Sequence, residues 1–260
     1  MSGRSAHLVA QGASISFGGL AAVTDFAVAI APGDLHGLIG PNGAGKTTVF
    51  NLLTGVYRPT AGRIEVGGES VVGMRPHTIA ARGVARTFQN IRLFRELTVL
   101  DNVRIACHHR AKVAWLQAML RTPRFLAEEE AIRERAQHYL GLMGLLAKKD
   151  ELAKSLPYGE QRRLEIARAL ATGPTTLLLD EPAAGMSRAE KDELMALIRS
   201  LRDELKLGVL LIEHDMRLVM GVCEEITVLD HGAIIARGKP EEVRRDAKVV
   251  QAYLGTEGRS

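Results

Sequence analysis

The stretch that decides the fold is Leu35-His36-Gly37-Leu38-Ile39-Gly40-Pro41-Asn42-Gly43-Ala44-Gly45-Lys46-Thr47-Thr48-Val49-Phe50-Asn51-Leu52-Leu53. Residues 35–39 form a short apolar run typical of a buried strand, and residues 47–53 carry apolar side chains at helical spacing. Residues 40–47 between them match the pattern GxxxxGK(S/T) in full. The stretch therefore predicts a strand, a tight glycine-rich loop and a helix in direct succession.

The residue types in this loop suit phosphate binding. Glycines let successive backbone N–H groups face phosphate oxygens, and the helix N-terminus adds partial positive charge. The Lys46 ammonium reaches the β/γ-phosphates, and the Thr47 hydroxyl binds Mg²⁺. We therefore predict an ATP-type nucleotide with Mg²⁺, although a glycine turn followed by a solvated lysine is the alternative. The predicted nucleotide-binding residues are Gly40, Pro41, Asn42, Gly43, Ala44, Gly45, Lys46, Thr47 and Thr48.

Two carboxylates follow a second apolar run, Thr176-Leu177-Leu178-Leu179. Asp180 is expected to hold the metal through water, and Glu181 to polarise the water that attacks the γ-phosphate. Taken alone, an acidic pair at a strand end is an ordinary feature. The phosphate loop earlier in the chain favours the catalytic interpretation.

Composition excludes several other classes of protein. The 260 residues are 46% hydrophobic and 25% charged, as in ordinary globular proteins. The net charge of +4 is not concentrated in any run of five like charges, which argues against a dedicated nucleic-acid surface. Cys107 and Cys223 lie far apart, so a zinc site or disulfide is not expected. No apolar run approaches the roughly 18 residues needed to cross a bilayer, so the chain is expected to be cytoplasmic, with any membrane association made through a partner.

The pattern of elements predicts an α/β fold with an insert. Residues 7–30 and 59–68 resemble short antiparallel strands broken by glycine turns, whereas residues 84–88, 175–179, 208–212 and 226–229 resemble core strands. Helical spacing dominates residues 97–109, 111–121 and 123–146. We therefore predict a nucleotide-binding core with a β-subdomain over residues 1–89 and 157–260, and a helical subdomain over residues 90–156.

Further motifs complete a recognisable series. Gln89 ends Thr87-Phe88-Gln89, a glycine-containing turn Leu156-Pro157-Tyr158-Gly159-Glu160 opens a helix, and His214 follows the apolar run 210–212. With the phosphate loop and Asp180-Glu181, these motifs resemble, in order and spacing, the ATP-binding subunits of ABC transporters. The resemblance covers essentially the whole chain. It implies a P-loop NTPase core of the RecA-like kind, with an N-terminal antiparallel β-subdomain and an inserted helical subdomain.

The resemblance also implies roles for individual residues. Gln89 would contact Mg²⁺ and the attacking water and relay this to a membrane subunit, and His214 would contact the γ-phosphate. Phe17 would stack on adenine, with a buried core phenylalanine as the alternative. Two subunits would pack head to tail, so that each ATP lies between the loop of one subunit and the signature of the other. The signature residues that bind the second subunit's ATP would be Tyr158, Gly159 and Glu160.

Longer stretches resemble one subfamily, the branched-chain amino-acid importer ATPases of the LivG type. These stretches are residues 86–99, 156–168, 180–186 and 212–220, together with the ending Ala252-Tyr253-Leu254-Gly255. The implied partners are two transmembrane permease subunits, a second ATP-binding subunit and, indirectly, a periplasmic binding protein. A heterodimer of ATP-binding subunits is favoured, with a homodimer as the alternative. These partners would place the chain on the cytoplasmic face of the inner membrane as a peripheral subunit. Alternatives are the ATPase of a urea or amide importer, of lipopolysaccharide export, or a soluble ABC protein acting on ribosomes or DNA.

The chain also departs from the family pattern at two positions. Pro157 replaces the usual signature serine and lacks both a hydroxyl and a backbone N–H. Ser187 replaces a common aspartate in the loop after Glu181. Both changes bear on communication across the dimer. A metal site at His108-His109 is not expected, because neighbouring side chains on a helix diverge by about 100°.

Overall fold

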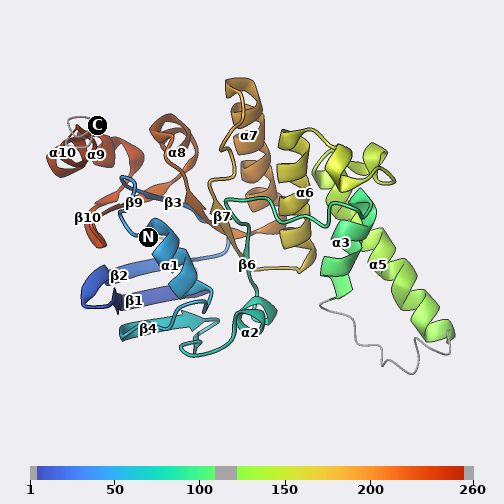
Figure 1. Ribbon diagram of the computed structural model, residues 1–260, viewed down its shortest axis with the longest axis horizontal. Helices are drawn as coiled ribbons and strands as arrows, with labels where there is room; N and C mark the ends of the chain where they lie inside the picture. The colour runs from blue at the N-terminus through green and yellow to red at the C-terminus, as the bar shows by residue number, and fades with distance from the viewer. Residues whose placement is uncertain (1–4, 109–121, 255–260) are drawn as a thin grey trace. The chain divides into compact units, whose positions relative to one another are not determined.

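The computed structural model describes residues 5–108 and 122–254. The chain forms two compact units, one of Met1–Gln89 with Thr175–Ser260 and one of Asn90–Pro174 (Figure 1). The sequence predicts the second boundary after residue 156 instead. The difference is helix α6 (Tyr158–Ala171), which belongs to the second unit because it packs against α3 (Val99–Cys107) and α5 (Pro123–Leu142).

The first unit contains two β-sheets. The four-stranded antiparallel sheet has the order β2-β1-β4-β5, and the six-stranded sheet has the order β10-β9-β3-β8-β7-β6. The strands of the first sheet are β1 (Leu8–Phe17), β2 (Leu20–Ile30), β4 (Ala61–Val66) and β5 (Glu69–Ser70). Those of the second are β3 (Leu35–Ile39), β6 (Val84–Arg86), β7 (Thr176–Asp180), β8 (Gly208–Ile212), β9 (Glu225–Asp230) and β10 (Ala233–Gly238). The predicted combination of an antiparallel β-subdomain with an α/β core is confirmed.

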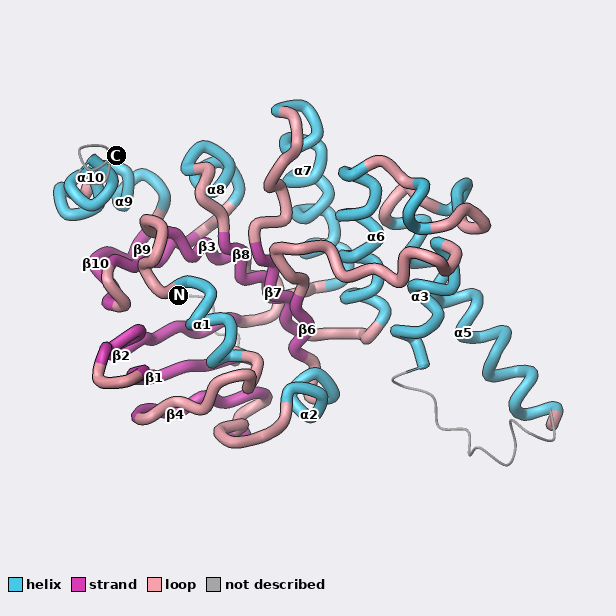
Figure 2. The backbone as a smooth tube through the Cα atoms, viewed as in Figure 1, coloured by secondary structure: helices cyan, strands magenta, loops and turns pink. Residues whose placement is uncertain are grey.

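Helix α1 (Lys46–Leu53) lies between the two sheets, as Figure 2 makes visible. Its Phe50 is fully buried in one core with Leu8 and Phe26 of the antiparallel sheet and Leu38 and Leu178 of the larger sheet. The other helices of this unit are α2 (Pro76–Ala81), α7 (Arg188–Leu205), α8 (Met216–Val222), α9 (Pro240–Arg245) and α10 (Ala247–Leu254). Strands β3, β7 and β8 are buried at every position, as expected for parallel strands covered on both faces.

The direction of the core strands determines where the loops meet. Strand β3 pairs parallel with β8 and β9, and β7 pairs parallel with β6 and β8. The carboxyl ends of β3, β6, β7 and β8 therefore lie along the same edge of the sheet. The phosphate loop, Gln89, Glu181 and His214 each follow one of these ends.

In the described part of the second unit, residues 90–108 and 122–174, the regular structure is helical apart from one isolated β-bridge between Thr98 and Leu152. It contains α3, α5 and α6 with the short 3₁₀ segments η2 (Leu146–Lys148) and η3 (Ala153–Ser155). The helix predicted over residues 111–121, and His109, lie outside the described residues. Among residues 5–108 and 122–254, no helix combines the length and the apolar composition needed to cross a bilayer.

Candidate active site

The loop between β3 and α1 makes turns that require glycine. The φ angles of Gly40, Gly43 and Gly45 are 154°, 80° and 100°, which side-chain-bearing residues adopt rarely. A Cβ atom on Gly40 would lie 2.1 Å from the carbonyl oxygen of Leu229, at the end of β9. The neighbouring strand therefore excludes side chains from the base of the loop.

Lys46 is the first residue of α1, and its ammonium group turns back over the loop. The Lys46 Nζ donates hydrogen bonds to the carbonyl oxygens of Gly40 (2.7 Å) and Pro41 (2.9 Å). Burial lowers the pKa of Lys46, and the carboxylates of Glu181 and Asp180 oppose that shift. The cation of the loop is therefore electrostatically coupled to both carboxylates that follow from β7.

Glu181 directly follows β7 in an uncommon backbone conformation. Its φ of 45° lies in the left-handed region, which costs a side-chain-bearing residue about 1–2 kcal/mol. Its N–H donates to the Ile212 carbonyl at 2.9 Å. Its carboxylate accepts a 3.1 Å hydrogen bond from Gln89 Nε2 and lies 3.8 Å from His214 Nδ1. The structure thus brings together Gln89, Glu181 and His214 from three separate loops.

Glu213 stabilises the loop after Glu181 and lies beside His214, although the sequence alone predicts no role for it. Its side chain is 1% exposed and accepts a 2.9 Å hydrogen bond from the Ala183 N–H in the loop after Glu181. Burial raises the pKa of Glu213, while the Ala183 N–H and His214 oppose the shift. A carboxylate beside His214 was visible in the sequence, but its burial depends on the packing of the loop after β7.

Asp180 is the last residue of β7 and is paired with Arg86, the last residue of β6. The Arg86 Nη2 lies 2.9 Å from Asp180 Oδ2, and both side chains are more than nine-tenths buried. The Asp180 N–H also points to the Thr87 hydroxyl at 3.3 Å. The sequence alone predicts no site role for Arg86 or Thr87, because their contacts with Asp180 become evident only when β6 is known to lie beside β7.

The donor groups predicted for Mg²⁺ have suitable chemistry. The Thr47 hydroxyl, the Gln89 amide oxygen and the Asp180 carboxylate offer the hard oxygen atoms that Mg²⁺ prefers. Across the described parts of the chain, no three His, Cys, Asp or Glu side chains are grouped to hold a metal ion by themselves. Proteins usually bind Mg²⁺ through one or two side chains together with nucleotide phosphates.

Phe17 ends β1 and is 46% exposed, so it is not the buried core phenylalanine of the alternative interpretation. Its ring packs edge to face on Tyr57, with centroids 5.1 Å apart and an interplanar angle of 69°. Tyr57 in turn packs against the core around α1. An aromatic ring at the surface, supported along one side, is suitable for stacking on a base.

The signature residues lie in the second unit, in the first turn of α6. Pro157 is the N-cap residue, and no side chain caps this helix. The Tyr158 hydroxyl accepts a 3.2 Å hydrogen bond from Arg162, and Glu160 is ion-paired with Lys148 at 2.7 Å. The other departure from the family pattern has a structural role, since Ser187 caps α7 in a reciprocal capping box.

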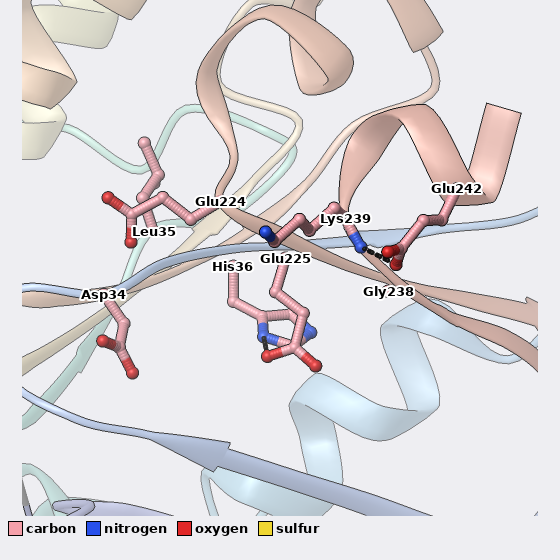
Figure 3. Close-up of a pocket in the computed structure, with 8 residues that line it drawn as sticks. All are labelled: Asp34, Leu35, His36, Glu224, Glu225, Gly238, Lys239 and Glu242. Atoms are coloured by element: carbon pink, nitrogen blue, oxygen red, sulfur yellow. Dashed lines mark hydrogen bonds and ion pairs between the residues drawn. The ribbon is translucent and has the colours of Figure 1, made fainter. Parts of the chain in front are cut away.

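A separate hollow of about 510 Å³ lies at the amino end of β3, whereas the phosphate loop follows the carboxyl end. Figure 3 shows its lining, formed by Asp34, Leu35, His36, Glu224, Glu225, Gly238, Lys239 and Glu242. It contains none of the predicted site residues. The hollow is therefore not part of the predicted nucleotide site.

Comparison with known proteins agrees with this geometry. The family model described as ABC transporter matches residues 23–184, and the model described as branched-chain amino acid ATP-binding cassette transporter matches residues 233–259. The chain is 47% identical to the high-affinity branched-chain amino acid transport ATP-binding protein BraF of Pseudomonas aeruginosa and 46% identical to LivG of Escherichia coli. Each match covers 95% of this chain and 97% of the relative. The lipopolysaccharide export ATP-binding protein LptB of Haemophilus influenzae is 36% identical over the same shares.

Solved structures agree in fold. The ADP conformation of MJ1267, an ATP-binding cassette of an ABC transporter, superposes with a TM-score of 0.83 at 29% identity, covering 96% of this chain and 99% of that one. For cbiO1 from Clostridium perfringens the TM-score is 0.81 at 25% identity, covering 97% and 95%. The site geometry, the family models and these relatives lead to one conclusion: the chain belongs to the ATP-binding, ATP-hydrolysing subunits of ABC transporters.

Proposed function

We propose that this ATPase powers the uptake of branched-chain or similar small amino acids. The observation that carries the proposal is the 46–47% identity to BraF and LivG along 95% of the chain. The branched-chain model matched by residues 233–259 supports the same substrate class. Lipopolysaccharide export is the second candidate, and the lower identity of 36% to LptB makes it the weaker one.

In this proposal the chain works as a peripheral subunit on the cytoplasmic face of the inner membrane. It docks on two transmembrane permease subunits, which receive substrate from a periplasmic binding protein. A second ATP-binding subunit completes the nucleotide sites, and we favour a different chain over a second copy. The first turn of α6 then faces the ATP held by that second subunit.

The phosphate loop and Lys46 bind the triphosphate of ATP. The Lys46 ammonium is held by the Gly40 and Pro41 carbonyls, and phosphate oxygens offer it stronger, charge-assisted hydrogen bonds. Backbone N–H groups of residues 40–47, except that of Pro41, which has none, bind phosphate oxygens, and Thr48 follows in the first turn of α1. Phe17 provides the stacking surface for adenine.

Thr47, Gln89 and Asp180 are the residues that would hold Mg²⁺, which neutralises phosphate charge when bound. Glu181 accepts a proton from the attacking water, and its bond from Gln89 Nε2 and its proximity to His214 orient the carboxylate. His214 then donates a hydrogen bond toward the γ-phosphate. Glu213 restrains the loop after Glu181 through the Ala183 N–H.

The experiment is purification of the tagged chain from membranes of its own organism, with identification of the proteins that co-purify. Permease and second ATP-binding subunits are expected with it. The complex in proteoliposomes should then take up radiolabelled leucine, isoleucine or valine in an ATP-dependent manner, and the Glu181→Gln complex should not. Uptake of urea alone, or recovery with lipopolysaccharide export proteins, would replace the proposed substrate class while leaving the ATPase assignment intact.

A further inference from the structure

We propose that Arg86 is a positioning residue that holds the Asp180 carboxylate in place for Mg²⁺ and ties it to the helix of the phosphate loop. The inference rests on the proposed role of Asp180 as a metal-binding residue. It concerns a residue outside the phosphate loop, the signature and the predicted metal donors. Three independent sets of contacts carry it.

The first contact is the ion pair itself. Arg86 Nη2 and Asp180 Oδ2 are 2.9 Å apart, with side chains 8% and 5% exposed. A buried carboxylate without a partner is strongly destabilised, so the guanidinium compensates a charge that the site needs. It also leaves the carboxylate fewer orientations, because a charge-assisted hydrogen bond is directional.

The second set of contacts fixes the guanidinium. Arg86 Nη1 donates to Asn51 Oδ1 of α1 at 2.7 Å and lies 3.5 Å from the Thr54 hydroxyl just after that helix. The guanidinium also stacks over the rings of Phe50 and Phe88, with centroid distances of 5.3 and 5.1 Å. A planar, forked cation can satisfy Asp180 and Asn51 together while stacking, and a lysine ammonium cannot.

The third set of contacts continues along the chain after Arg86. The Thr87 N–H donates to the Leu178 carbonyl at 2.9 Å, and the Thr87 hydroxyl accepts from the Asp180 N–H. Two residues later Gln89 donates to Glu181. Residues 86–89 therefore hold both carboxylates of the site, Asp180 at one end and Glu181 at the other.

These contacts join the two halves of the metal site. Helix α1 begins with Lys46 and Thr47 of the phosphate loop, and in its second half Asn51 accepts the hydrogen bond through which Arg86 connects the helix to β7. The distance between the Thr47 hydroxyl and the Asp180 carboxylate is therefore set in part by Arg86. Loss of a residue that orients a metal-binding group typically weakens metal affinity about 10–100-fold.

The test measures metal affinity rather than turnover. Mn²⁺ binding to the ADP complex is followed by electron paramagnetic resonance, and ADP binding without metal by titration of a fluorescent ADP. Arg86→Met should weaken Mn²⁺ binding about 10–100-fold and leave metal-free ADP affinity within about twofold. Arg82→Met, on a half-buried arginine paired with the exposed Glu69 in the same unit, is the matched control and should change neither.

Arg86→Lys and Asn51→Ala test the same proposal with smaller changes, in case Arg86→Met fails to fold. Each should weaken Mn²⁺ binding by a smaller factor in the same direction, because each removes only part of the anchorage. Unchanged or tighter Mn²⁺ binding in folded Arg86 variants would overturn the proposal and reduce Arg86 to a packing residue or a competing charge. Unchanged Mn²⁺ binding in Arg86→Lys and Asn51→Ala would overturn it equally if Arg86→Met fails to fold.

Asp180→Asn separates this inference from the function on which it rests. It should weaken Mn²⁺ binding, and adding Arg86→Met to it should cost less than a further twofold, since both act through one carboxylate. If Asp180→Asn binds Mn²⁺ normally, the metal role of Asp180 fails and the positioning role fails with it. Metal-free ADP binding that still depends on Lys46 would in that case leave the nucleotide site established.

Discussion

At the scale of single residues, Glu181 offers the most direct test of the chemistry. Glu181→Gln keeps the size of the side chain and its oxygen acceptor for Gln89 but removes its basicity. ATP binding should persist while kcat falls about 10²–10⁴-fold, the usual range for a lost general base. Titration with a fluorescent ATP and phosphate release by the assembled transporter measure the two quantities. Glu204→Gln, on the exposed face of α7, should leave both unchanged, and wild-type turnover in Glu181→Gln would remove Glu181 from the mechanism.

The contact between Phe17 and Tyr57 predicts a base-specific effect. Phe17→Ala should weaken ATP binding by about 5–150-fold, corresponding to the loss of about 1–3 kcal/mol of stacking energy. Inorganic triphosphate, which has no base, should bind both proteins equally. Tyr57→Ala should cause a smaller loss in the same direction, because it removes only the support of the Phe17 ring. Equal losses for ATP and triphosphate would point to damage in the phosphate loop instead.

The sequence predicts residues whose chemistry is local and misses those whose role depends on a neighbour distant in the chain. Lys46 is evident from the spacing of residues 40–47, because one backbone turn creates its environment. Arg86 acquires its role only through Asp180, 94 residues later, in the adjacent strand. Glu213 is similar, since only the packing of Ala183 explains its burial.

At the scale of elements, the pairing of β3 with β9 carries a buried histidine. His36 is 2% exposed, with Nε2 at 2.8 Å from the Thr227 hydroxyl and Nδ1 at 3.6 Å from Glu225 Oε2. Burial lowers the pKa of His36 to about 4, an effect that Glu225 opposes and Arg237 reinforces. At neutral pH the ring is therefore uncharged, and its contact with Glu225 is not an ion pair.

The lowered pKa of His36 predicts acid sensitivity. In the unfolded chain His36 becomes protonated below about pH 6.5, whereas in the folded chain it stays neutral down to about pH 4. The lowered pKa of His36 therefore has no effect on the free energy of unfolding above about pH 6.5. As pH falls from there toward 4, it lowers the free energy of unfolding by roughly 3 kcal/mol. Urea unfolding between pH 7.5 and 4.5 should have a shallower pH slope in His36→Gln than in the wild type. The control variant His77→Gln, on an exposed histidine, should retain the pH slope of the wild type. A wild-type slope in His36→Gln would show that His36 does not cause the acid sensitivity.

The boundaries of the elements show a second limit of sequence analysis. The apolar runs of β7 and β8 were predicted within one residue, because parallel strands buried on both faces have unbroken hydrophobic sequences. The assignment of α6 to the helical unit was not predicted. Its apolar positions show that it has a buried side, but only tertiary packing determines that α3 and α5 cover it.

At the scale of the assembled molecule, Pro157 predicts unequal nucleotide sites. In a heterodimer whose other chain has a complete signature, the ATP on Lys46 is capped normally, and the other ATP faces Pro157. A missing donor of this kind costs about 2.7–4 kcal/mol in the transition state. Glu181→Gln in this chain should then reduce transporter ATPase more than the equivalent change in the other subunit.

Pro157→Ser is the complementary variant. The φ and ψ angles of Pro157, −54° and 154°, are those of an ordinary N-cap, so serine fits without backbone change and also caps α6. It should narrow the difference between the two glutamate mutants in steady-state phosphate release. Equal losses from the two mutants before this change would mean that Pro157 has no kinetic consequence.

The position of the helical unit in the topology has an evolutionary consequence. Strands β6 and β7 are parallel neighbours, with Val84 opposite Thr176, yet the whole of Asn90–Pro174 lies between them in sequence. Such a connection takes about a dozen residues or more and is usually made by an α-helix. Here a separately packed module replaces it, while the sheet makes its own hydrogen bonds. Substitutions within the module can therefore accumulate without altering the strand register on which hydrolysis depends.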